Sequence, residues 1–547
     1  MSYAEAQYTI DEVLSGVKGM QIAGNEPANL ANIKILGGDG HCFLSWTPQD
    51  TVIDGQVVTT VVGVIIRRKE GDFPNDENDG VLVGDFTGAE LYKYISQHFT
   101  DEGLTNGVTY YYRFFPYTAY GMMNRSFDNR ATGTPQDATR WGFHQNFLDK
   151  NPDTCITYLD NATGYTPMMT NTDNGTHTYG SWENWDWFKR IKPFLVKAST
   201  GVAASSINET DYGKDRGGNN ITYSNSSNMS DFDYFAWLPK IYMKEIYAAD
   251  GNSRDVYFAL DTEGECYDYK PIGFYNKAGE EVEGLFIPMF YPNSVSNKPR
   301  SMFKAQFTSG ANTIPGWISE IQNRWGSRGV AFGGPILNLI RDMLYMLYRT
   351  TDIQKVAGYG NSINKTSSSS STTTQNNQYY GTYKANWGGG KSASYQTTRM
   401  FHSNILGGCF SGLIDPYLVC VGGQVHIAKD YNSNPSDLSG YTSVYGLSYS
   451  TSVVYPSKLV FCKEGYGSLP ASYSDPGSTT TGLCDSVRAS SGNRAAVRIG
   501  LPSSGDDAGQ AYLYAFRNLT DTDPVYSTFV APMVIPDVGY VPNWDTI

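Results

Sequence analysis

The sequence lacks the short motifs on which most catalytic and metal sites depend. Its 547 residues contain no P-loop, no G-x-S-x-G nucleophile motif and no H-E-x-x-H zinc motif, and no G-x-G-x-x-G opens a helix after a strand. The seven cysteines show no C-x-x-C spacing, and the six histidines are scattered along the chain. We therefore expect no catalytic residue, no metal ligand and no cofactor.

Charge and long apolar runs are also scarce. Only 17% of the residues are charged, and the net charge is −13 with a pI near 5.0, which argues against nucleic-acid binding and against docking on an anionic membrane. The longest apolar run, Leu337–Leu347, is interrupted by Asn338, Arg341 and Asp342, so we expect no membrane insertion. Residues 1–5 do not resemble the start of a signal peptide.

Aromatic residues and glycine are abundant instead. The chain has 41 tyrosines, 25 phenylalanines, 10 tryptophans and 57 glycines. Aromatic side chains suit half-buried strand positions, and glycine suits the turns between strands. A chain of 547 residues is also long enough for three or four domains. We therefore expect a mainly β, multidomain protein.

The clearest domain signature runs from Pro27 to Asn124. Apolar and polar residues alternate along residues 31–35, 44–46 and 62–67, as on half-buried strands. Residues 104–110 then carry a leucine, a turn glycine and a tyrosine, each three residues apart. This is the order of a tyrosine corner, in which the first tyrosine of a strand bonds to the backbone upstream. With Trp46, the stretch resembles a fibronectin type III domain, and the resemblance implies a β-sandwich over residues 27–134 that serves as a spacer or display platform.

The rest of the chain divides by composition. Residues 1–26 carry a weak helical stripe and are interpreted as an N-terminal lead that anchors the chain to a partner. A Thr-Gly-Thr-Pro linker ends the sandwich, and residues 136–300 are β-rich, with strands expected within 235–244, 256–260 and 285–290. Residues 301–547 combine a helix pair, a low-complexity excursion over 361–400 and a β-rich remainder.

The helix pair is expected between Pro315 and Gly360. Each proline at 315 and 335 can open a helix at its first turn. Apolar residues at 336, 339, 340, 343 and 347 have helical spacing, and a second apolar stripe predicts that the second helix is buried on most sides. Glycines at 358 and 360 are expected to end it.

The order of features from 231 to 360 is similar to that in tail proteins of gut bacteriophages. It comprises a strand with Trp-Leu-Pro-Lys, polar hairpins, a basic segment at 298–302, the two helices and Gly-Tyr-Gly-Asn at 358–361. The resemblance implies that the C-terminal half forms an α+β C-type-lectin-like module. It places a core segment at 404–412 and the closing strands at 494–500, 509–516 and 529–534. The calcium-site tripeptides of animal lectins are missing, so we expect no calcium site.

Candidate binding residues follow from a stretch crowded with tyrosine, serine and asparagine between 431 and 456. Recognition loops use this composition, because tyrosine offers amphipathic contact area at low entropic cost. We predict a ligand-binding surface on this stretch and on a late strand, formed by Tyr431, Tyr441, Tyr445, Tyr449, Tyr455, Tyr512 and Tyr514. The alternative interpretation is that these tyrosines only line strands.

Two further groups of residues are candidates for carbohydrate chemistry. Three tryptophans within residues 182–187 suit a sugar-stacking platform, although an amphipathic helix packed on a neighbour is the favoured interpretation. Acidic residues beside aromatic ones are the candidates for a glycosidase carboxylate pair, although caps and surface positions are their commoner roles: Glu183, Asp186, Asp231 and Asp233.

Together with the resemblance, these features favour a non-enzymatic phage virion protein, a tail fibre or receptor-binding appendage that binds the host surface through its C-terminal module. Scattered cysteines indicate free thiols from a reducing cytoplasm, and release of a virion by lysis reconciles this with a domain of extracellular type. The expected partners are other virion proteins and a bacterial surface glycan or protein receptor. A homo-oligomer is expected, and the resemblance implies a trimer. A virion glycan depolymerase and a purely structural capsid or baseplate appendage remain open alternatives.

Overall fold

The protein is described by a computed structural model that divides into two compact units. The first comprises Met1–Thr139 and Asp261–Asp268, and the second Arg140–Leu260 and Tyr269–Ile547. The structure describes residues 26–53, 55–136, 139–171, 176–221, 230–290, 292–295, 298–303, 312–357, 400–406, 412–471, 476–489, 492–499, 513–518 and 528–547. The predicted N-terminal helical stripe lies outside these residues, as do nearly all of the low-complexity excursion and part of the core segment expected at 404–412.

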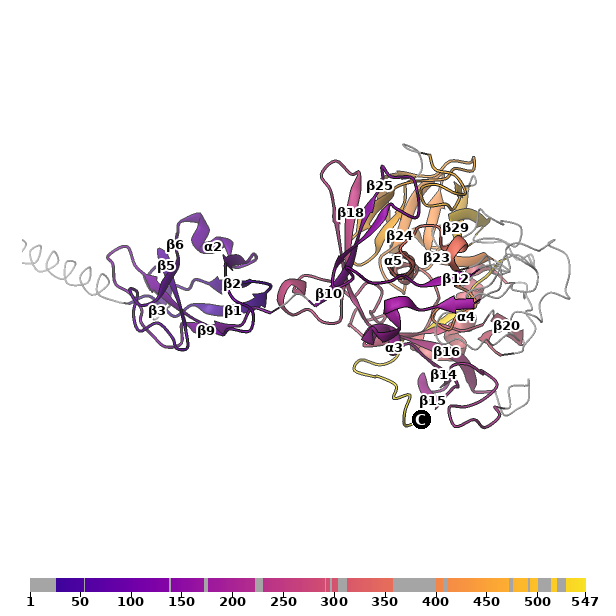
Figure 1. The fold of residues 1–547 in the computed structure, drawn as a ribbon, viewed down its shortest axis with the longest axis horizontal. Helices are drawn as coiled ribbons and strands as arrows, with labels where there is room; N and C mark the ends of the chain where they lie inside the picture. Colours follow the sequence, from indigo (N-terminus) through magenta and orange to yellow (C-terminus); the bar gives the residue numbers. More distant parts are fainter. Residues whose placement is uncertain are drawn as a thin grey trace, which may run out of the picture. The chain divides into compact units, whose positions relative to one another are not determined.

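The first unit contains two antiparallel sheets (Figure 1). One sheet has the order β1 (Ala31–Gly38), β2 (His41–Thr47) and β7 (Phe99–Glu102). The other has the order β6 (Val81–Thr87), β5 (Gly63–Glu70), β8 (Tyr110–Tyr117) and β9 (Arg130–Gly133). A hairpin of β3 (Thr51–Ile53) and β4 (Gln56–Thr59), the short helix α2 (Ala89–Lys93) and the 3-10 turn η3 (Gly264–Cys266) complete the unit.

Both sheets contribute alternate residues to one core, as the period-2 pattern predicts. On β2 the buried side chains are those of Cys42, Leu44 and Trp46. The Trp46 ring centroid lies 5.0 Å from that of Phe86 and 5.9 Å from that of Phe114, so rings from the two sheets meet in the interior. The first unit is therefore a pair of antiparallel sheets around a shared aromatic core.

The predicted tyrosine corner is confirmed. Tyr110 is the first residue of β8, and its hydroxyl accepts a hydrogen bond from the Thr105 N–H at 3.0 Å. Leu104 is buried beside it in the same core, and Gly107 has a φ of 79°, a left-handed conformation that favours glycine. The corner fixes the path of the chain into the central strand of the sheet.

The second unit contains three larger sheets within its described residues. The first has the order β11 (Ile156–Asp160), β10 (Arg140–Asn146), β18 (Ser253–Ala259) and β17 (Tyr242–Tyr247). The second has the order β15 (Val202–Ser206), β14 (Lys192–Lys197), β16 (Phe232–Pro239), β19 (Gly284–Pro288), β32 (Pro532–Val534) and β22 (Gly329–Ala331). The third has the order β25 (Tyr441–Ser448), β24 (Gln424–Ala428), β23 (Gly412–Val421), β29 (Asn493–Arg498), β30 (Leu513–Asn518) and β28 (Val487–Ala489), and β31 (Thr528–Phe529) pairs with β23.

Smaller elements connect these sheets. The hairpins are β12 (Met169–Asn171) with β13 (Thr176–Thr178), β20 (Pro292–Val295) with β21 (Lys298–Ser301), and β26 (Leu459–Lys463) with β27 (Gly467–Pro470). The helices are α3 (Asp186–Lys189), α4 (Ile314–Trp325), α5 (Pro335–Tyr348) and α6 (Ile353–Ala357), with 3-10 turns η1 (Gly180–Asn184), η4 (Gly326–Arg328) and η7 (Leu438–Gly440). The chain is thus mainly β, as expected, and β32 returns the C-terminal region to a sheet built from much earlier strands.

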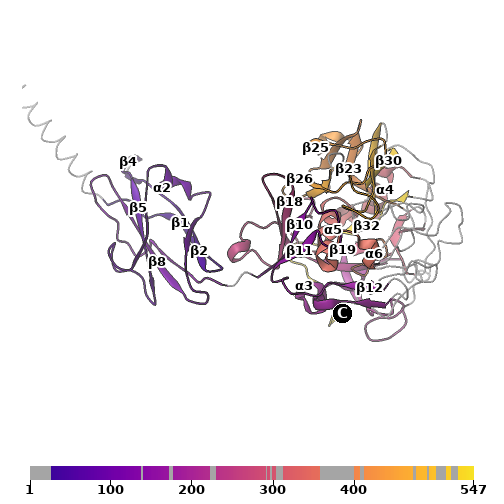
Figure 2. The same cartoon turned by 45° about the horizontal axis from the view of Figure 1, so that its top comes forward.

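Helix α5 runs through the middle of the second unit (Figures 1 and 2). Every residue from Ile336 to Tyr348 is buried, which confirms the prediction of burial on most sides. The helix ends at Tyr348 and not at the predicted glycines, because Arg349 adopts a left-handed conformation with a φ of 53°. The short α6 follows as a separate helix.

The middle of α5 carries charged side chains into the core. Asp342 accepts hydrogen bonds from Arg254 of β18 at 2.6 and 3.1 Å and from Arg341 at 2.9 Å. All three side chains are fully buried. The Arg254 guanidinium also lies 3.2 Å from Glu245 of β17. Toward the start of α5, Asn338 accepts a hydrogen bond from Arg498 of β29 at 3.1 Å. The helix is therefore fixed to two sheets by ionic and polar contacts as well as by apolar packing.

The prediction of one amphipathic helix around the three tryptophans is wrong. Trp185 has an extended backbone with a ψ of 124°, and it separates the 3-10 turn η1 from the single turn of α3. Trp182, Trp185 and Trp187 are only 0–3% exposed, with ring centroids 5.2–5.3 Å apart along the row. Their role is to pack the core, and they offer no platform to a sugar.

Candidate functional site

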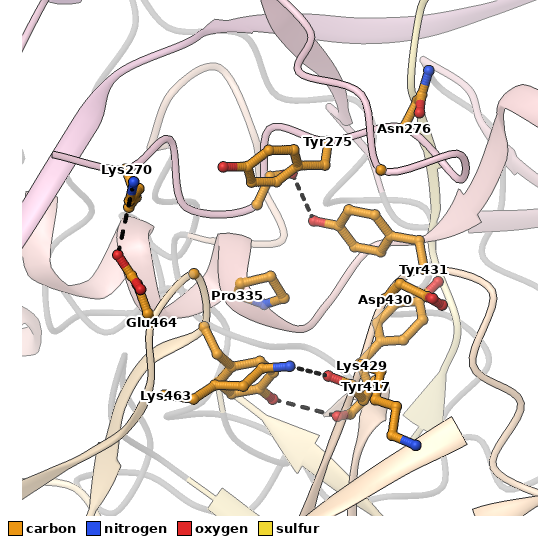
Figure 3. A pocket seen from close by; sticks show the side chains of 15 residues that line it. Lys270, Tyr275, Asn276, Pro335, Tyr417, Lys429, Asp430, Tyr431, Lys463 and Glu464 are labelled. Carbon is orange, nitrogen blue, oxygen red and sulfur yellow. Dashed lines mark hydrogen bonds and ion pairs between the residues drawn. The ribbon is translucent and has the colours of Figure 1, made fainter. Parts of the chain in front are cut away.

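A pocket of about 440 Å³ opens in the second unit. Five segments line it: the turn before β19 (270–279), the start of α5, β23, the loop after β24 (428–431) and the β26–β27 turn (463–466). Small-molecule sites in proteins typically occupy about 300–1,000 Å³, so the pocket is large enough for a small ligand. In Figure 3 the Tyr275 side chain lies on one side, Lys463 and Tyr417 lie on the other, and Pro335 lies between them.

Hydrogen bonds join the pocket walls to one another. The Tyr431 hydroxyl donates to the Gly273 carbonyl at 3.0 Å, and the Asn432 side chain donates to the Lys277 carbonyl at 2.7 Å, which joins the loop after β24 to the turn before β19. The Tyr466 hydroxyl donates to the Tyr417 carbonyl at 3.4 Å, which joins the β26–β27 turn to β23. These contacts shape the pocket before any ligand arrives.

The close approach of the turn requires a glycine at position 273. Its φ is 81°, and a Cβ atom there would lie 3.1 Å from Ile336 Cδ1 and 3.2 Å from the Tyr431 hydroxyl. The turn itself is held by Asn276, whose side-chain oxygen accepts from the N–H groups of Ala278 and Glu280 at 2.9 and 3.0 Å.

The aromatic lining is neutral. Burial raises the pKa of Tyr417, Tyr431 and Tyr466 above its ordinary value, so these phenols keep their protons and serve as walls. Tyr417 and Tyr431 meet edge to face with ring centroids 5.3 Å apart. Tyr275 is only half-buried, and burial together with Glu281 and Glu464 raises the pKa of its hydroxyl. It is therefore the tyrosine of the lining most open to a ligand.

The charged lining carries one more cation than anions. Lys270, Lys429 and Lys463 line the pocket with two carboxylates, those of Asp430 and Glu464. Lys270 Nζ lies 3.9 Å from Glu464 Oε1 on the exposed rim. Lys463 is half-buried and donates to the Ala428 carbonyl at 3.4 Å. Burial lowers the pKa of this ammonium, and the nearby Asp430 partly offsets that effect.

The predicted tyrosines do not form one continuous surface. Tyr431 lines the pocket and is 8% exposed. Tyr441 on β25 is 6% exposed, as the strand-lining interpretation describes, and Tyr449, which follows β25, is 4% exposed. Tyr445 on β25 is fully exposed, and Tyr455 is half-buried. Tyr512 lies outside the described residues, and for Tyr514 only its position on β30 is described. Ligand binding by this set stays a prediction.

The candidate acids do not line the pocket. Asp233 is fully buried and pairs with Arg300 and Arg324, each at 2.8 Å. Asp231 accepts from the Ser199 hydroxyl at 2.7 Å, and Asp186 pairs with Lys189 at 3.5 Å on the surface. Glu183 is exposed on η1. Asp186 and Glu183 occupy the surface positions favoured for them, whereas Asp233 departs from that expectation as a buried ion-pair partner.

One group resembles a catalytic relay but is closed to substrate. The Tyr212 hydroxyl lies 2.6 Å from His402 Nδ1, and His402 Nε2 lies 3.7 Å from Glu209. Burial opposes ionisation of Glu209, but His402 and Lys192 outweigh it and lower its pKa to about 2. Tyr212 and His402 are 0% exposed, so this network fixes the core. Among the residues that the structure describes, no group of three or more His, Cys, Asp or Glu side chains could hold a metal ion. In that same part of the chain, no helix is long and apolar enough to cross a membrane.

Sequence reasoning found one wall of the pocket and missed the others. Tyr431 belongs to the predicted stretch, but Lys270, Tyr275 and Lys463 come from segments far from it in sequence and follow no motif spacing. The available local signal was a tight turn with a charged pair and a tyrosine, Lys-Glu-Gly-Tyr-Gly at 463–467. Only the fold brings it next to the turn before β19.

Comparison with models of known protein families and with curated proteins finds no match for this chain.

Proposed function

We propose that the protein is a structural component of a bacteriophage virion, a tail fibre or receptor-binding appendage, that attaches the particle to the host cell. In this proposal the first unit is a fibronectin type III-like spacer. The second is a C-type-lectin-like recognition module that binds and does not cleave its ligand. Other virion proteins anchor it, and it acts as a homo-oligomer, with a trimer as the expected state.

The first unit supports the spacer role. Its three-stranded and four-stranded sheets around one core, with the tyrosine corner at Tyr110, fit a fibronectin type III-like sandwich. Among the described residues, its histidines and carboxylates form no metal-binding group. A rigid module of this kind can hold a recognition unit away from the particle, and several copies can raise weak affinity through effective concentration.

The observation that carries the proposal is the pocket of the second unit. Aromatic side chains, amide groups and lysines converge there on loops held by the sheets and by α5. Loops on a rigid scaffold are the common place for recognition sites. The half-buried Tyr275 offers a ring to the apolar face of a sugar, and the polar rim offers hydrogen bonds to its hydroxyl groups.

The test is binding of the fluorescently labelled full-length chain to intact bacteria of the host range, measured by flow cytometry. Tyr275→Ala should weaken binding at least about tenfold, equal to about 1.4 kcal/mol. Tyr445→Ala removes a fully exposed tyrosine that does not line the pocket and should leave binding unchanged. Point variants are preferable to C-terminal truncation, because truncation would remove β32 from its sheet.

Each alternative predicts a different result. Loss of binding in Tyr445→Ala but not in Tyr275→Ala would move recognition to the surface of β25. Release of reducing sugar from the cells would indicate a depolymerase and refute the non-enzymatic proposal. An unmodified chain that binds no host cell would favour a purely structural appendage.

A further inference from the structure

We propose that the pocket recognises an acidic saccharide, a sugar residue bearing a carboxylate or phosphate group within a bacterial surface polysaccharide. The inference rests on the proposed function, because it assigns a ligand class to the same site. It follows from the charge, the burial and the apolar surface that meet at the pocket.

Lys463 is the principal anion-binding group in this proposal. Its side chain is half-buried at the pocket, and its ammonium donates to the Ala428 carbonyl at 3.4 Å. Among the described residues, no carboxylate oxygen lies within 4.0 Å of Lys463 Nζ. Asp430 acts on this ammonium from beyond ion-pair distance. A partly desolvated ammonium that forms no ion pair gains more from an incoming anion than a hydrated one does.

The other charges around the pocket favour the same ligand. Lys429 Nζ donates to the Ser439 carbonyl at 2.9 Å, and within the described part of the chain it also has no carboxylate at salt-bridge distance. The contact of Lys270 with Glu464 is long, at 3.9 Å, and exposed. Three lysines therefore face two carboxylates in a chain whose net charge is −13. The lining thus carries one more positive than negative charge on an acidic protein, which favours an anionic group at this position.

The start of α5 supplies apolar surface. Pro335, the first residue of this 14-residue helix, lines the pocket. The positive end of the helix dipole already faces an anion, because the buried Asp415 carboxylate accepts from the Gly334 N–H at 2.9 Å. Pro335 and the Tyr275 ring provide apolar surface, so the lining combines a cationic part with a part suited to the C–H face of a sugar ring.

The experiment measures binding of the full-length chain to surface polysaccharide purified from bacteria that it binds. Three preparations are compared: the intact polymer, the polymer after carbodiimide–borohydride reduction of its carboxylates, and the polymer after removal of phosphate with hydrofluoric acid. We expect binding to the intact polymer and its loss after one of the two treatments. The treatment that abolishes binding identifies the acidic group.

Substitutions at Lys463 connect the anion to the pocket. Lys463→Met keeps the apolar stem and removes the charge, so binding to the intact polymer should weaken about 10- to 100-fold, as expected for loss of a hydrogen bond to a charged group. Lys463→Arg keeps the charge and should retain most of the binding. Lys189→Met removes an exposed lysine outside the pocket and should have no effect.

The outcomes separate this inference from the proposed function. Unchanged binding after both chemical treatments, or equal binding by Lys463→Met and Lys189→Met, would refute the acidic ligand and leave host attachment intact. Binding to cells without binding to the polysaccharide would also refute it and indicate a protein receptor. Failure to bind any host cell would refute the proposed function itself.

Discussion

Asp342 provides the sharpest test of how the second unit is held together. Its carboxylate lies in the core between the guanidinium groups of Arg254 and Arg341, with bonds of 2.6–3.1 Å and no solvent exposure on any of the three side chains. Burial opposes the ionised form, but the two arginines outweigh it and lower the pKa of Asp342. Asp342→Asn keeps the shape and removes the charge.

The expected loss of stability is large, because the variant leaves two buried cations with less compensating charge. Removing one partner of a buried ion pair typically costs about 3–5 kcal/mol. For a unit of this size, with an unfolding entropy of about 2.1 cal/mol/K per residue, that cost lowers Tm by about 4–6 °C.

Differential scanning calorimetry on the full chain measures this change in the transition of the second unit. The matched control is Asp186→Asn, which breaks an ion pair on the surface. In that pair the Asp186 side chain is 77% exposed and the Lys189 side chain is 49% exposed. That transition should stay within about 1 °C of the unmodified protein. If Asp342→Asn melts at the same temperature as the control, the network does not stabilise the fold as argued.

Three further predictions follow. Tyr110→Phe removes the hydrogen bond to Thr105 and should destabilise the first unit by about 1 kcal/mol. Calorimetry should show only that transition lowered, with the exposed Tyr120→Phe as control. Burial raises the pKa of Glu245 from 4.5 to about 7 despite Arg254, so the native state keeps a proton that the unfolded chain releases above pH 4.5. The contribution of Glu245 to the free energy of unfolding therefore falls as pH rises from 5 to 7. The Tm of Glu245→Gln relative to the unmodified protein should increase over that range, and a constant difference would contradict this. In a Cys409→Ser/Cys462→Ser background, Ellman's reagent at pH 8 should react slowly until urea is added, because the remaining cysteines are buried. Rapid native labelling would contradict the burial that raises the thiol pKa to about 11 or 12 at Cys42, Cys155 and Cys420.

Local patterns in the sequence were sufficient for much of the fold. The alternation around Leu44 and Trp46, the spacing of the tyrosine corner and the helical stripes after Pro335 all correspond to observed elements. Each of these depends on residues close together in the chain. The helix expected around the tryptophans failed because Trp185 takes an extended conformation, and tertiary packing decided that feature. The end of α5 was missed because Arg349, which is not a glycine, adopts the left-handed conformation.

The candidate site was far less predictable. A tyrosine-rich segment has the composition of a recognition loop whether its rings face solvent or the core, and Tyr441 and Tyr449 are buried while Tyr445 is fully exposed. The pocket depends on contacts between residues far apart in sequence, such as the 158-residue separation between Tyr431 and Gly273. No short-range periodicity encodes such a contact, so the lysines of the lining could not be grouped in advance.

The buried network and the pocket are connected through α5. Asn338 donates to the Tyr466 carbonyl at 3.0 Å and Arg341 donates to the Ser468 carbonyl at 2.8 Å, so the helix holds the β26–β27 turn that carries Lys463. The start of the same helix packs against the turn at Gly273. Walls from distant segments thus take their positions from one buried helix, whose own position is fixed by Asp342 and its arginines. A site held this way loses little entropy on binding, because its groups are ordered beforehand. This explains how the half-buried Lys463 is kept in place at the pocket without an ion pair.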